Sequence, residues 1–337
     1  MTLGVAILGT GRLGGRYIDS INASQGAETR VVAEPREEQV SDLRTAHPDI
    51  EFVADYREVL QRDDIDIVVG TLPHCLHYQA SLDSLEAGKH VFLEKPMALN
   101  TVECDEMLAS AKANNRLLMT AHTQRYFGEN RKMKEIIDSG DLGDVVMVNA
   151  MWVKPLDPHL RPPWMLEKDK GGGMGQMDGT HLIDRLIWLL GDDIRTVSGT
   201  SSNFTHPHLS TDDSGHHFIR WESGITASIT RMGWVHGITE YGADFFFTKG
   251  QAKHRRAYGG IGKTGVWVEK DNDWDEVPFD DINSQEVQFN DFVQAVIRGD
   301  SDSPTPMTHG RKVLKVLEAT EESHRTGKEV VIDDLMD

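Results

Sequence analysis

The feature that most restricts the fold is a group of glycines close to the start of the chain. An apolar run, Val5–Gly9, leads directly into Gly9-Thr10-Gly11-Arg12-Leu13-Gly14, and a helix-like segment covers residues 12–24. A G-x-G-x-x-G pattern is common by itself, but a position between a strand and a helix is the context that dinucleotide-binding βαβ units require. The alternative is a purely structural turn, which this context disfavours.

Each glycine of such a loop has its own task. Gly9 permits a tight turn, Gly11 lets a pyrophosphate approach the backbone, and Gly14 lets the helix pack closely on the strand. The N-terminus of the following helix offers unpaired N–H groups and a positive dipole end to phosphate oxygens. We therefore predict that the loop holds a dinucleotide through Gly9, Thr10, Gly11, Arg12, Leu13 and Gly14.

The first 120 residues alternate short apolar runs with helix-like segments. The expected strands are Val5–Gly9, Thr29–Glu34, Glu51–Ala54, Ile65–Thr71, His90–Leu93 and Leu117–Ala121. The expected helices lie near 12–24, 36–46, 56–61, 75–88 and 101–114. This alternation predicts a parallel, doubly wound sheet, a Rossmann domain over residues 1–121.

The pattern changes in residues 122–337, which we assign to a second α/β domain whose last helix could pack back on the first domain. A helix near 129–139 and a strand over Asp144–Lys154 come first, and a helix after Gly171-Gly172-Gly173 ends at Leu190. Further strands are expected at His216–Trp221, Ile225–Thr230, Asp244–Thr248 and Gly265–Val268, and helices after Asn283 and over 307–325. These runs predict a mostly antiparallel open sheet with one solvated or partner-facing side.

Glu34 is placed to select the cofactor. It ends the second expected strand, where an acidic side chain accepts hydrogen bonds from the adenosine ribose. A carboxylate there repels a 2′-phosphate and favours NAD over NADP, although Arg36, two residues on, could soften that preference. The alternative is a solvated Glu-Pro-Arg turn.

Composition excludes several functions. The 337 residues carry 35 Lys+Arg against 54 Asp+Glu, a formal charge of −19 that disfavours nucleic acid as a partner. No uncharged run is long enough to span a bilayer, and no signal peptide is recognisable, so a cytoplasmic protein is expected. Two cysteines outside any C-x-x-C pair and 15 histidines without H-E-x-x-H predict no catalytic metal.

The helix before Leu190 carries a polar stripe. His181, Asp184, Arg185 and Trp188 fall at helical spacings on one face of an otherwise apolar helix. The stripe indicates either a functional site or an exposed Asp184–Arg185 ion pair with His181 as a bystander.

Several motifs together resemble the Gfo/Idh/MocA family of sugar and cyclitol oxidoreductases. They are the glycine loop, Thr71-Leu72-Pro73 with His77, Glu94-Lys95-Pro96, Leu142-Gly143-Asp144, the triple glycine, and Gly179-Thr180-His181-Leu182-Ile183-Asp184. The resemblance covers nearly the whole chain. It implies a Rossmann domain followed by an α/β domain with a large open sheet, whose face often builds homodimers or homotetramers.

The resemblance also implies roles for particular residues. Lys95 would contact the reacting hydroxyl and His181 would act as acid or base, as suits an imidazole near neutral pH. The residues around the nicotinamide would be Thr71, Leu72, Pro73, His74, His77, Glu94, Lys95 and Pro96. A lysine could stabilise a developing alkoxide or act as the base itself, and the sequence does not rank Lys95 and His181 in that role.

One position departs from the family pattern. Many members carry an aspartate four residues before the histidine, where this chain has Met177. Either Asp178 or Asp184 then orients His181, or the chemistry is altered, because a thioether does not titrate.

The resemblance also implies substrate contacts after the sixth strand, and further candidates lie around the triple glycine, with ordinary packing or a solvated charge as the alternative for each. They are His122, Arg125 and Tyr126 after the sixth strand, then Trp152, Trp164 and Asp178, with Lys154, His159 and Arg161 as weaker candidates. The predicted function is oxidation of a secondary alcohol of a sugar, cyclitol or cyclic diol with NAD, or with NADP. The alternative is a redox-neutral enzyme of the lyase or glycosidase type that recycles the hydride on bound NAD.

Overall fold

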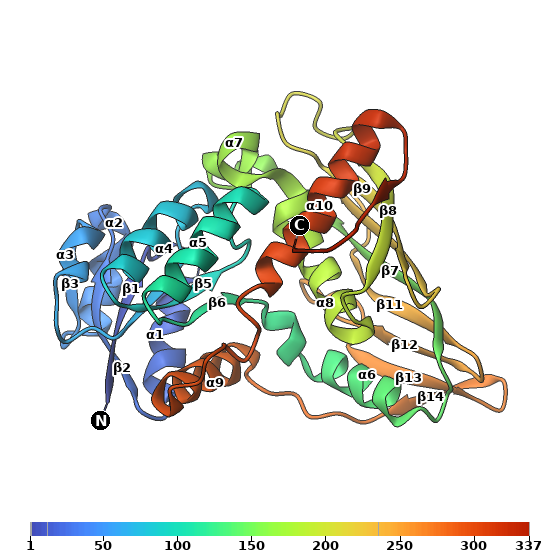
Figure 1. Ribbon diagram of the computed structural model, residues 1–337, viewed down its shortest axis with the longest axis horizontal. Coiled ribbons are helices and arrows are strands. Elements are labelled where there is room, and N and C mark those ends of the chain that lie inside the picture. Colours follow the sequence, from blue (N-terminus) through green and yellow to red (C-terminus); the bar gives the residue numbers. More distant parts are fainter. Residues whose placement is uncertain (1, 12, 235, 337) are drawn as a thin grey trace. The chain divides into compact units, whose positions relative to one another are not determined.

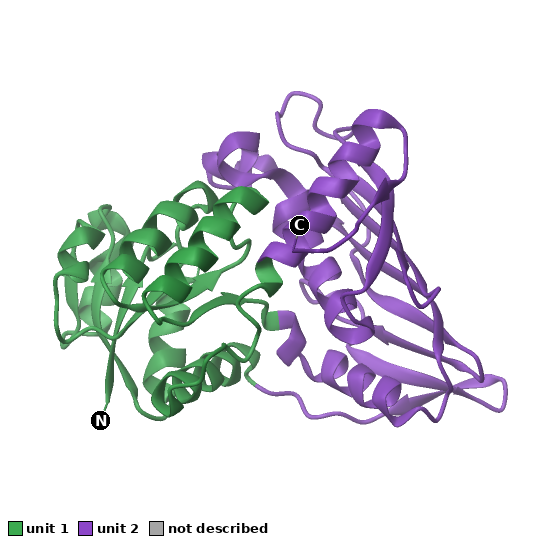
Figure 2. Cartoon of the chain, viewed as in Figure 1, with its two compact units in different colours: residues 1–123, 283–310 green, residues 124–282, 311–337 purple. Residues whose placement is uncertain are grey.

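The computed structural model describes residues 2–11, 13–234 and 236–336, and these divide into two compact units. The first unit comprises residues 1–123 and 283–310, and the second comprises 124–282 and 311–337 (Figure 2). Residues 283–310 therefore belong with the N-terminal sheet, whereas the sequence prediction grouped them with residues 122–337.

The first unit is built on a six-stranded parallel sheet in the order β3-β2-β1-β4-β5-β6 (Figure 1). The strands are β1 Leu3–Leu8, β2 Ala27–Ala33, β3 Glu51–Val53, β4 Ile67–Gly70, β5 His90–Glu94 and β6 Leu118–Ala121. This order reverses between β1 and β4, which places ligands at the carboxyl ends of these strands. The predicted doubly wound Rossmann sheet is confirmed.

Helices cover both faces of this sheet, as its apolar strands require. They are α1 Gly14–Ala23, α2 Glu37–Ala46, α3 Tyr56–Leu60, α4 His77–Glu86, α5 Thr101–Ala113 and α9 Ser284–Arg298, with a 3₁₀ turn at His74–Leu76. Phe289 and Phe292 of α9 pack their rings 5.2 and 5.4 Å from Phe92 of β5. That contact explains why α9 joins the first unit despite its distance along the chain.

The second unit holds a nine-stranded sheet in the order β14-β13-β12-β11-β7-β10-β9-β8-β15. Its strands are β7 Val145–Pro155, β8 Ile194–Ser202, β9 Ser214–Trp221, β10 Thr226–Trp234, β11 Glu240–Phe247, β12 Gln251–Arg255, β13 Gly265–Lys270, β14 Asp273–Val277 and β15 Val330–Val331. The pairs between these strands are antiparallel except β7 with β10. The predicted open, mostly antiparallel sheet is confirmed.

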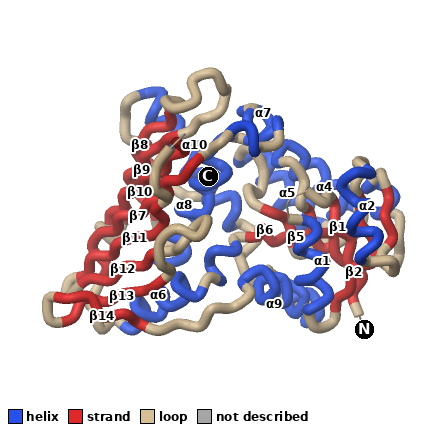
Figure 3. Tube along the Cα trace, turned by 180° about the vertical axis from the view of Figure 1, so that it is seen from behind, coloured by secondary structure: helices blue, strands red, loops and turns tan. Residues whose placement is uncertain are grey.

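Helices lie on one face of this sheet, and no helix among the described residues of the unit covers the other face (Figure 3). The helices of the unit are α6 Gly128–Ser139, α7 Lys168–Gly171, α8 Thr180–Leu190 and α10 His309–Thr326, and those on the sheet are α6, α8 and α10. Short turns occur at Thr123–Tyr126, Pro158–Leu160 and Pro163–Leu166. Along β7, Val148 and Ala150 are buried toward the helices while Met147 and Asn149 are exposed.

Among the described residues, none of the helices has the length and apolar character that a membrane crossing requires.

Candidate active site

The glycine loop has the geometry that a bound pyrophosphate needs. Gly9 has φ +88°, and a Cβ on Gly14 would lie 2.4 Å from the Gly9 carbonyl oxygen, so both positions require glycine. A Cβ on Gly11 would meet no atom within 4 Å, which is the open space expected where phosphate approaches the backbone. Leu13 directly precedes α1, while Arg12 lies outside the described residues.

The end of β4 is fastened to this loop. The Thr71 hydroxyl donates to the carbonyl oxygens of Gly9 and Leu8 at 2.6 and 3.2 Å. The side chain of Leu72 lies against Gly9, 3.2 Å from where its Cβ would be. The predicted cofactor segment after β4 is therefore adjacent to the loop.

His77 joins the segment after β4 to the segment after β5. Its Nδ1 lies 2.7 Å from the Pro96 carbonyl oxygen and its Nε2 lies 2.9 Å from that of Leu72. Burial holds the pKa of His77 below its ordinary value, although both carbonyls favour the protonated ring. The His74 ring is 5.5 Å from the His77 ring, and the Lys95–Pro96 peptide bond is cis.

Glu94, the last residue of β5, is held from two sides. Its Oε1 accepts from the Tyr17 hydroxyl at 2.7 Å and its Oε2 accepts from the Lys95 backbone N–H at 3.2 Å. Burial raises the pKa of the Glu94 carboxyl, while the Tyr17 hydrogen bond and the Lys95 charge oppose that rise. The motif Glu94-Lys95-Pro96 thus lies at the carboxyl edge of the parallel sheet.

Glu34 also lies at this edge, in contact with the loop. It is 5% exposed, and its Oε2 accepts from both the backbone N–H and the hydroxyl of Thr10. Burial alone would raise its pKa, but hydrogen bonds from Arg36 and Thr10 prevail and lower it to about 2. Glu34 is therefore a carboxylate near neutral pH.

His122 is the one predicted substrate contact that belongs to the first unit. It is 1% exposed and its ring lies edge-on to that of His309, 5.3 Å away. The remaining predicted substrate residues belong to the second unit.

In the second unit, a π-helix over Gly175–Gly179 precedes α8, where the sequence predicted one regular helix. This segment packs against a buried ion pair between Asp212 and Arg231 of β10. The Asp212 carboxylate accepts from the Gly175 N–H at 2.9 Å, and a Cβ on Gly173 would lie 2.0 Å from Asp212 Oδ1. The glycines of this segment are therefore needed to fit around a charged pair. π-Turns are frequent at functional sites.

Arg231 is enclosed on its remaining sides. Its Nε donates to His217 Nε2 at 3.2 Å, and a Cβ on Gly215 would lie 2.4 Å from its Nη2. His217 Nδ1 lies 2.8 Å from the hydroxyl of Thr320 on α10. Burial and the Arg231 charge hold the pKa of His217 well below its ordinary value, so this ring is neutral.

Asp178, in the π-helix, pairs with Lys154 of β7. The Lys154 Nζ lies 2.7 Å from Asp178 Oδ1, and both side chains are about 5% exposed or less. The same ammonium lies 4.3 Å from the Trp152 ring centroid, within cation–π distance. Met177 is buried beside Asp178.

Asp184 pairs with Arg125 rather than with Arg185. Arg125 Nε donates to Asp184 Oδ1 at 2.8 Å, and Arg185 Nη1 donates to the Tyr241 hydroxyl at 3.0 Å. Asp184 and Arg185 are both 0% exposed. The alternative of an exposed Asp184–Arg185 ion pair is therefore wrong, because α8 turns this stripe into the unit.

His181 lies beside an aromatic cluster. Its ring is 5.8 Å from that of Trp152, which in turn lies 4.8 Å from Tyr241 and 5.8 Å from Tyr258. His181 is half-buried. Tyr126 lies in the turn Thr123–Tyr126 and Trp164 in the turn Pro163–Leu166, both half-buried.

Sequence reasoning did not select four of these residues. Asp212, Arg231, Tyr241 and Tyr258 are distant along the chain from the motifs they contact. Lys154 was only a weaker candidate, although a signal existed: it shares the inward face of β7 with Trp152, so a lysine there must be paired or functional.

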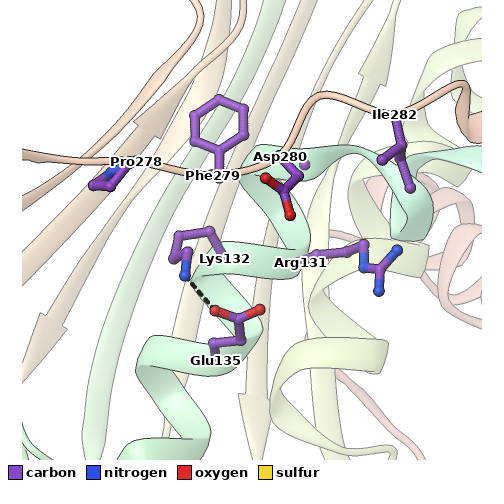
Figure 4. A pocket seen from close by; sticks show the side chains of 8 residues that line it. Arg131, Lys132, Glu135, Pro278, Phe279, Asp280 and Ile282 are labelled. Carbon is purple, nitrogen blue, oxygen red and sulfur yellow. Dashed lines mark hydrogen bonds and ion pairs between the residues drawn. The ribbon is translucent and has the colours of Figure 1, made fainter.

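A groove of about 330 Å³ lies beside the first turns of α6, apart from the predicted site residues (Figure 4). Its lining residues are Gly128, Arg131, Lys132, Glu135, Pro278, Phe279, Asp280 and Ile282. Lys132 and Glu135 pair with each other across one turn of α6.

The fold and the glycine loop define a protein with a dinucleotide-binding Rossmann domain. Residues 3–122 match the oxidoreductase family with an NAD-binding Rossmann fold, and residues 130–253 match the C-terminal domain of the same family. The chain belongs to the Gfo/Idh/MocA family.

The sequence identity to individual relatives is low. Inositol 2-dehydrogenase of Acidiphilium cryptum is 27% identical over 315 residues, covering 90% of this chain and 89% of that enzyme. The 2,7-anhydro-N-acetylneuraminate hydratase of Mediterraneibacter gnavus is 27% identical over 205 residues, covering 61% of this chain and 54% of that protein. An uncharacterized oxidoreductase of Streptococcus pneumoniae also matches, over 56% of its own length. The chain therefore spans about half the length of two of these curated relatives.

Among solved structures, levoglucosan dehydrogenase in complex with NADH and levoglucosan has the same fold. The TM-score is 0.87 at 20% identity, covering 99% of this chain and 100% of that chain.

Proposed function

We propose that this protein is a nicotinamide-dependent dehydrogenase that oxidises a secondary alcohol of a sugar, cyclitol or cyclic diol. The observation that carries the proposal is the glycine loop, open at Gly11 and closed at Gly9 and Gly14, on the sheet edge that also ends in Glu94-Lys95. Ligands of doubly wound sheets bind at this edge. The inositol and levoglucosan dehydrogenases among its relatives support this substrate class.

In the proposed reaction the bound nicotinamide supplies the hydride acceptor, and the protein handles the proton. Lys95 holds the reacting hydroxyl and stabilises negative charge that develops on its oxygen. His181 takes part in moving the proton. These two assignments rest on the family pattern.

The second unit offers groups suited to a hydroxylated ring. Trp152 and Tyr258 belong to one aromatic cluster, and the buried Lys154–Asp178 pair next to Trp152 combines a donor and an acceptor. Sugars and cyclitols have both apolar C–H faces and hydroxyl edges, so we propose that the ring binds against this cluster.

A second candidate is a redox-neutral reaction in which the hydride returns to the substrate. Buried Met177 stands where many family members have an aspartate, and one relative is a hydratase. This candidate predicts product that depends on bound NAD without any net NADH.

The test is a panel of sugars, inositols and dihydrodiols assayed with NAD⁺ and NADP⁺ for absorbance at 340 nm and for product. Lys95→Met and His181→Gln should each lower turnover at least about a hundredfold. The exposed Lys112 of α5 provides the matched control Lys112→Met, which should retain activity. Full turnover in both site variants would refute the assignment, and product without NADH would select the redox-neutral reaction.

We further propose a cytoplasmic homodimer or homotetramer that associates through the open face of the nine-stranded sheet. Met147, at 45% exposure, and Trp274, at 39%, are large apolar side chains on strands of this sheet. Sedimentation equilibrium tests the assembly, and Met147→Glu should weaken it.

A further inference from the structure

The Glu34 carboxylate, which the sequence predicted to accept hydrogen bonds from ribose, is already engaged by donors of this chain. Oε1 accepts from the Arg36 backbone N–H at 3.2 Å and from Arg36 Nε at 2.6 Å. Oε2 accepts from Thr10 N at 3.0 Å, Thr10 Oγ1 at 3.1 Å and Arg36 Nη2 at 2.9 Å. A carboxylate has about four lone-pair positions. These contacts leave none for a ribose hydroxyl.

Arg36 is the group of this pair that faces solvent. Its side chain is 53% exposed, whereas that of Glu34 is 1% exposed. Its Nε and Nη2 form a two-pronged contact with the carboxylate, a geometry that fixes the guanidinium in place. An arginine has five N–H donors, so those on Nη1 remain directed away from Glu34.

The charge at this position therefore differs from the one the sequence suggested. Glu34 and Arg36 together are neutral, so the repulsion that an isolated carboxylate exerts on a 2′-phosphate is largely cancelled. Glu37 and Glu38 in the first turn of α2 are exposed, and solvent and salt screen them. Of the two side chains, only the guanidinium is exposed enough to contact a phosphate at this edge.

We propose that Arg36, held by Glu34, is the residue that contacts the adenosine ribose end of the cofactor, and that the chain binds NADP(H) at least as tightly as NAD(H). Glu34 is then a positioning residue. The proposal rests on the proposed function only in requiring that the glycine loop hold a dinucleotide.

The test is calorimetric titration of the full chain with NAD⁺ and with NADP⁺, without substrate. Wild type should bind NADP⁺ with a Kd equal to or below that for NAD⁺. Arg36→Ala should weaken NADP⁺ binding roughly ten- to a hundredfold and change NAD⁺ binding less than about threefold. Arg44→Ala, which removes the same charge from the last turn of α2, the helix that Arg36 directly precedes, is the control and should leave the ratio of the two constants unchanged.

Glu34→Gln separates the two readings of the carboxylate. If Glu34 only positions Arg36, the variant binds NAD⁺ nearly as wild type does and loses part of its NADP⁺ affinity. A tenfold or greater loss of NAD⁺ affinity would mean that the carboxylate acts on the ribose or on the Thr10 loop, which both cofactors share, and it would overturn the inference.

Two further outcomes distinguish this inference from the proposed function. Tight NAD⁺ binding with at least about tenfold weaker NADP⁺ binding would overturn the role of Arg36 and leave the dehydrogenase proposal intact. If neither nucleotide binds, both proposals fail. Circular dichroism of each variant establishes that it is folded.

Discussion

Breaking the buried ion pair between Asp212 and Arg231 should strongly destabilise the second unit. Asp212→Ala leaves the Arg231 guanidinium, which is 2% exposed, without its carboxylate. Removing one partner of a buried ion pair costs about 3–5 kcal/mol, because the remaining charge is buried and unpaired. At about 2–4 °C per kcal/mol for a unit of this size, the midpoint of thermal unfolding should fall by roughly 6–20 °C.

Differential scanning calorimetry of a double-mutant cycle measures this coupling. Arg231→Met removes the second charge and fills similar volume, so Asp212→Ala with Arg231→Met should be more stable than the sum of the single changes predicts. The coupling should be about 1–3 kcal/mol. Additive effects, or a loss below about 1 kcal/mol in Asp212→Ala, would refute the reasoning.

Three other perturbations test separate parts of the fold. The pKa of His217 is lowered in the folded state, so the unfolded chain binds this proton at a higher pH than the folded chain does. The free energy of unfolding should therefore fall as pH drops below about 6.5. In His217→Gln the unfolding temperature should depend less on pH between pH 8 and 5. Gly11→Ala should preserve the unfolding temperature but weaken NAD⁺ binding in calorimetry, because its Cβ meets no atom of the chain. Gly14→Ala should lower both the unfolding temperature and the affinity for NAD⁺, because its Cβ would collide with the Gly9 carbonyl oxygen. Tyr17→Phe removes a hydrogen bond that lowers the pKa of Glu94, so the carboxyl of Glu94 should titrate at higher pH in the variant than in wild type when its NMR chemical shift is followed.

The first unit could be read from the sequence because its signals are local. Each apolar run that alternates with a helix became a strand of the parallel sheet, with ends that differ by only a few residues. Strands buried on both faces are continuously apolar, and this pattern stands out from its surroundings. The motifs Gly9–Gly14 and Glu94-Lys95-Pro96 are contiguous in the sequence, so they can be located without knowing any contact between distant residues.

Strands of the open sheet were harder to predict. β8, β12, β14 and β15 were missed, and β14 shows the reason. Its sequence, Asp-Trp-Asp-Glu-Val, is mostly charged and exposed, and it pairs only with β13 at the end of the sheet. A strand with a solvated face and few apolar residues has no period-two alternation to detect.

The π-helix before α8 was also not predicted, and the Asp212 carboxylate that accepts from its Gly175 N–H lies 37 residues away along the chain.

Contacts made in the folded chain also decide what the carboxylates proposed as site residues can do. These contacts change the expected roles of the carboxylates in the reaction. Glu34, Asp178 and Asp184 were each considered for their acceptor oxygens. Each forms an ion pair with a basic side chain, at 2.6 Å with Arg36, 2.7 Å with Lys154 and 2.8 Å with Arg125. Taking a proton would cost each of them its ion pair.

Proton transfer in the proposed reaction therefore falls to Lys95 and His181, and the three carboxylates position their basic partners. Asp178→Asn supplies the check. If Asp178 holds Lys154 in place, this change should raise KM for the substrate about tenfold and leave the pH dependence of kcat unaltered. If Asp178 instead takes the proton, kcat should fall while its pH profile loses the acidic limb, and measurement of both constants from pH 5 to 9 decides between these roles.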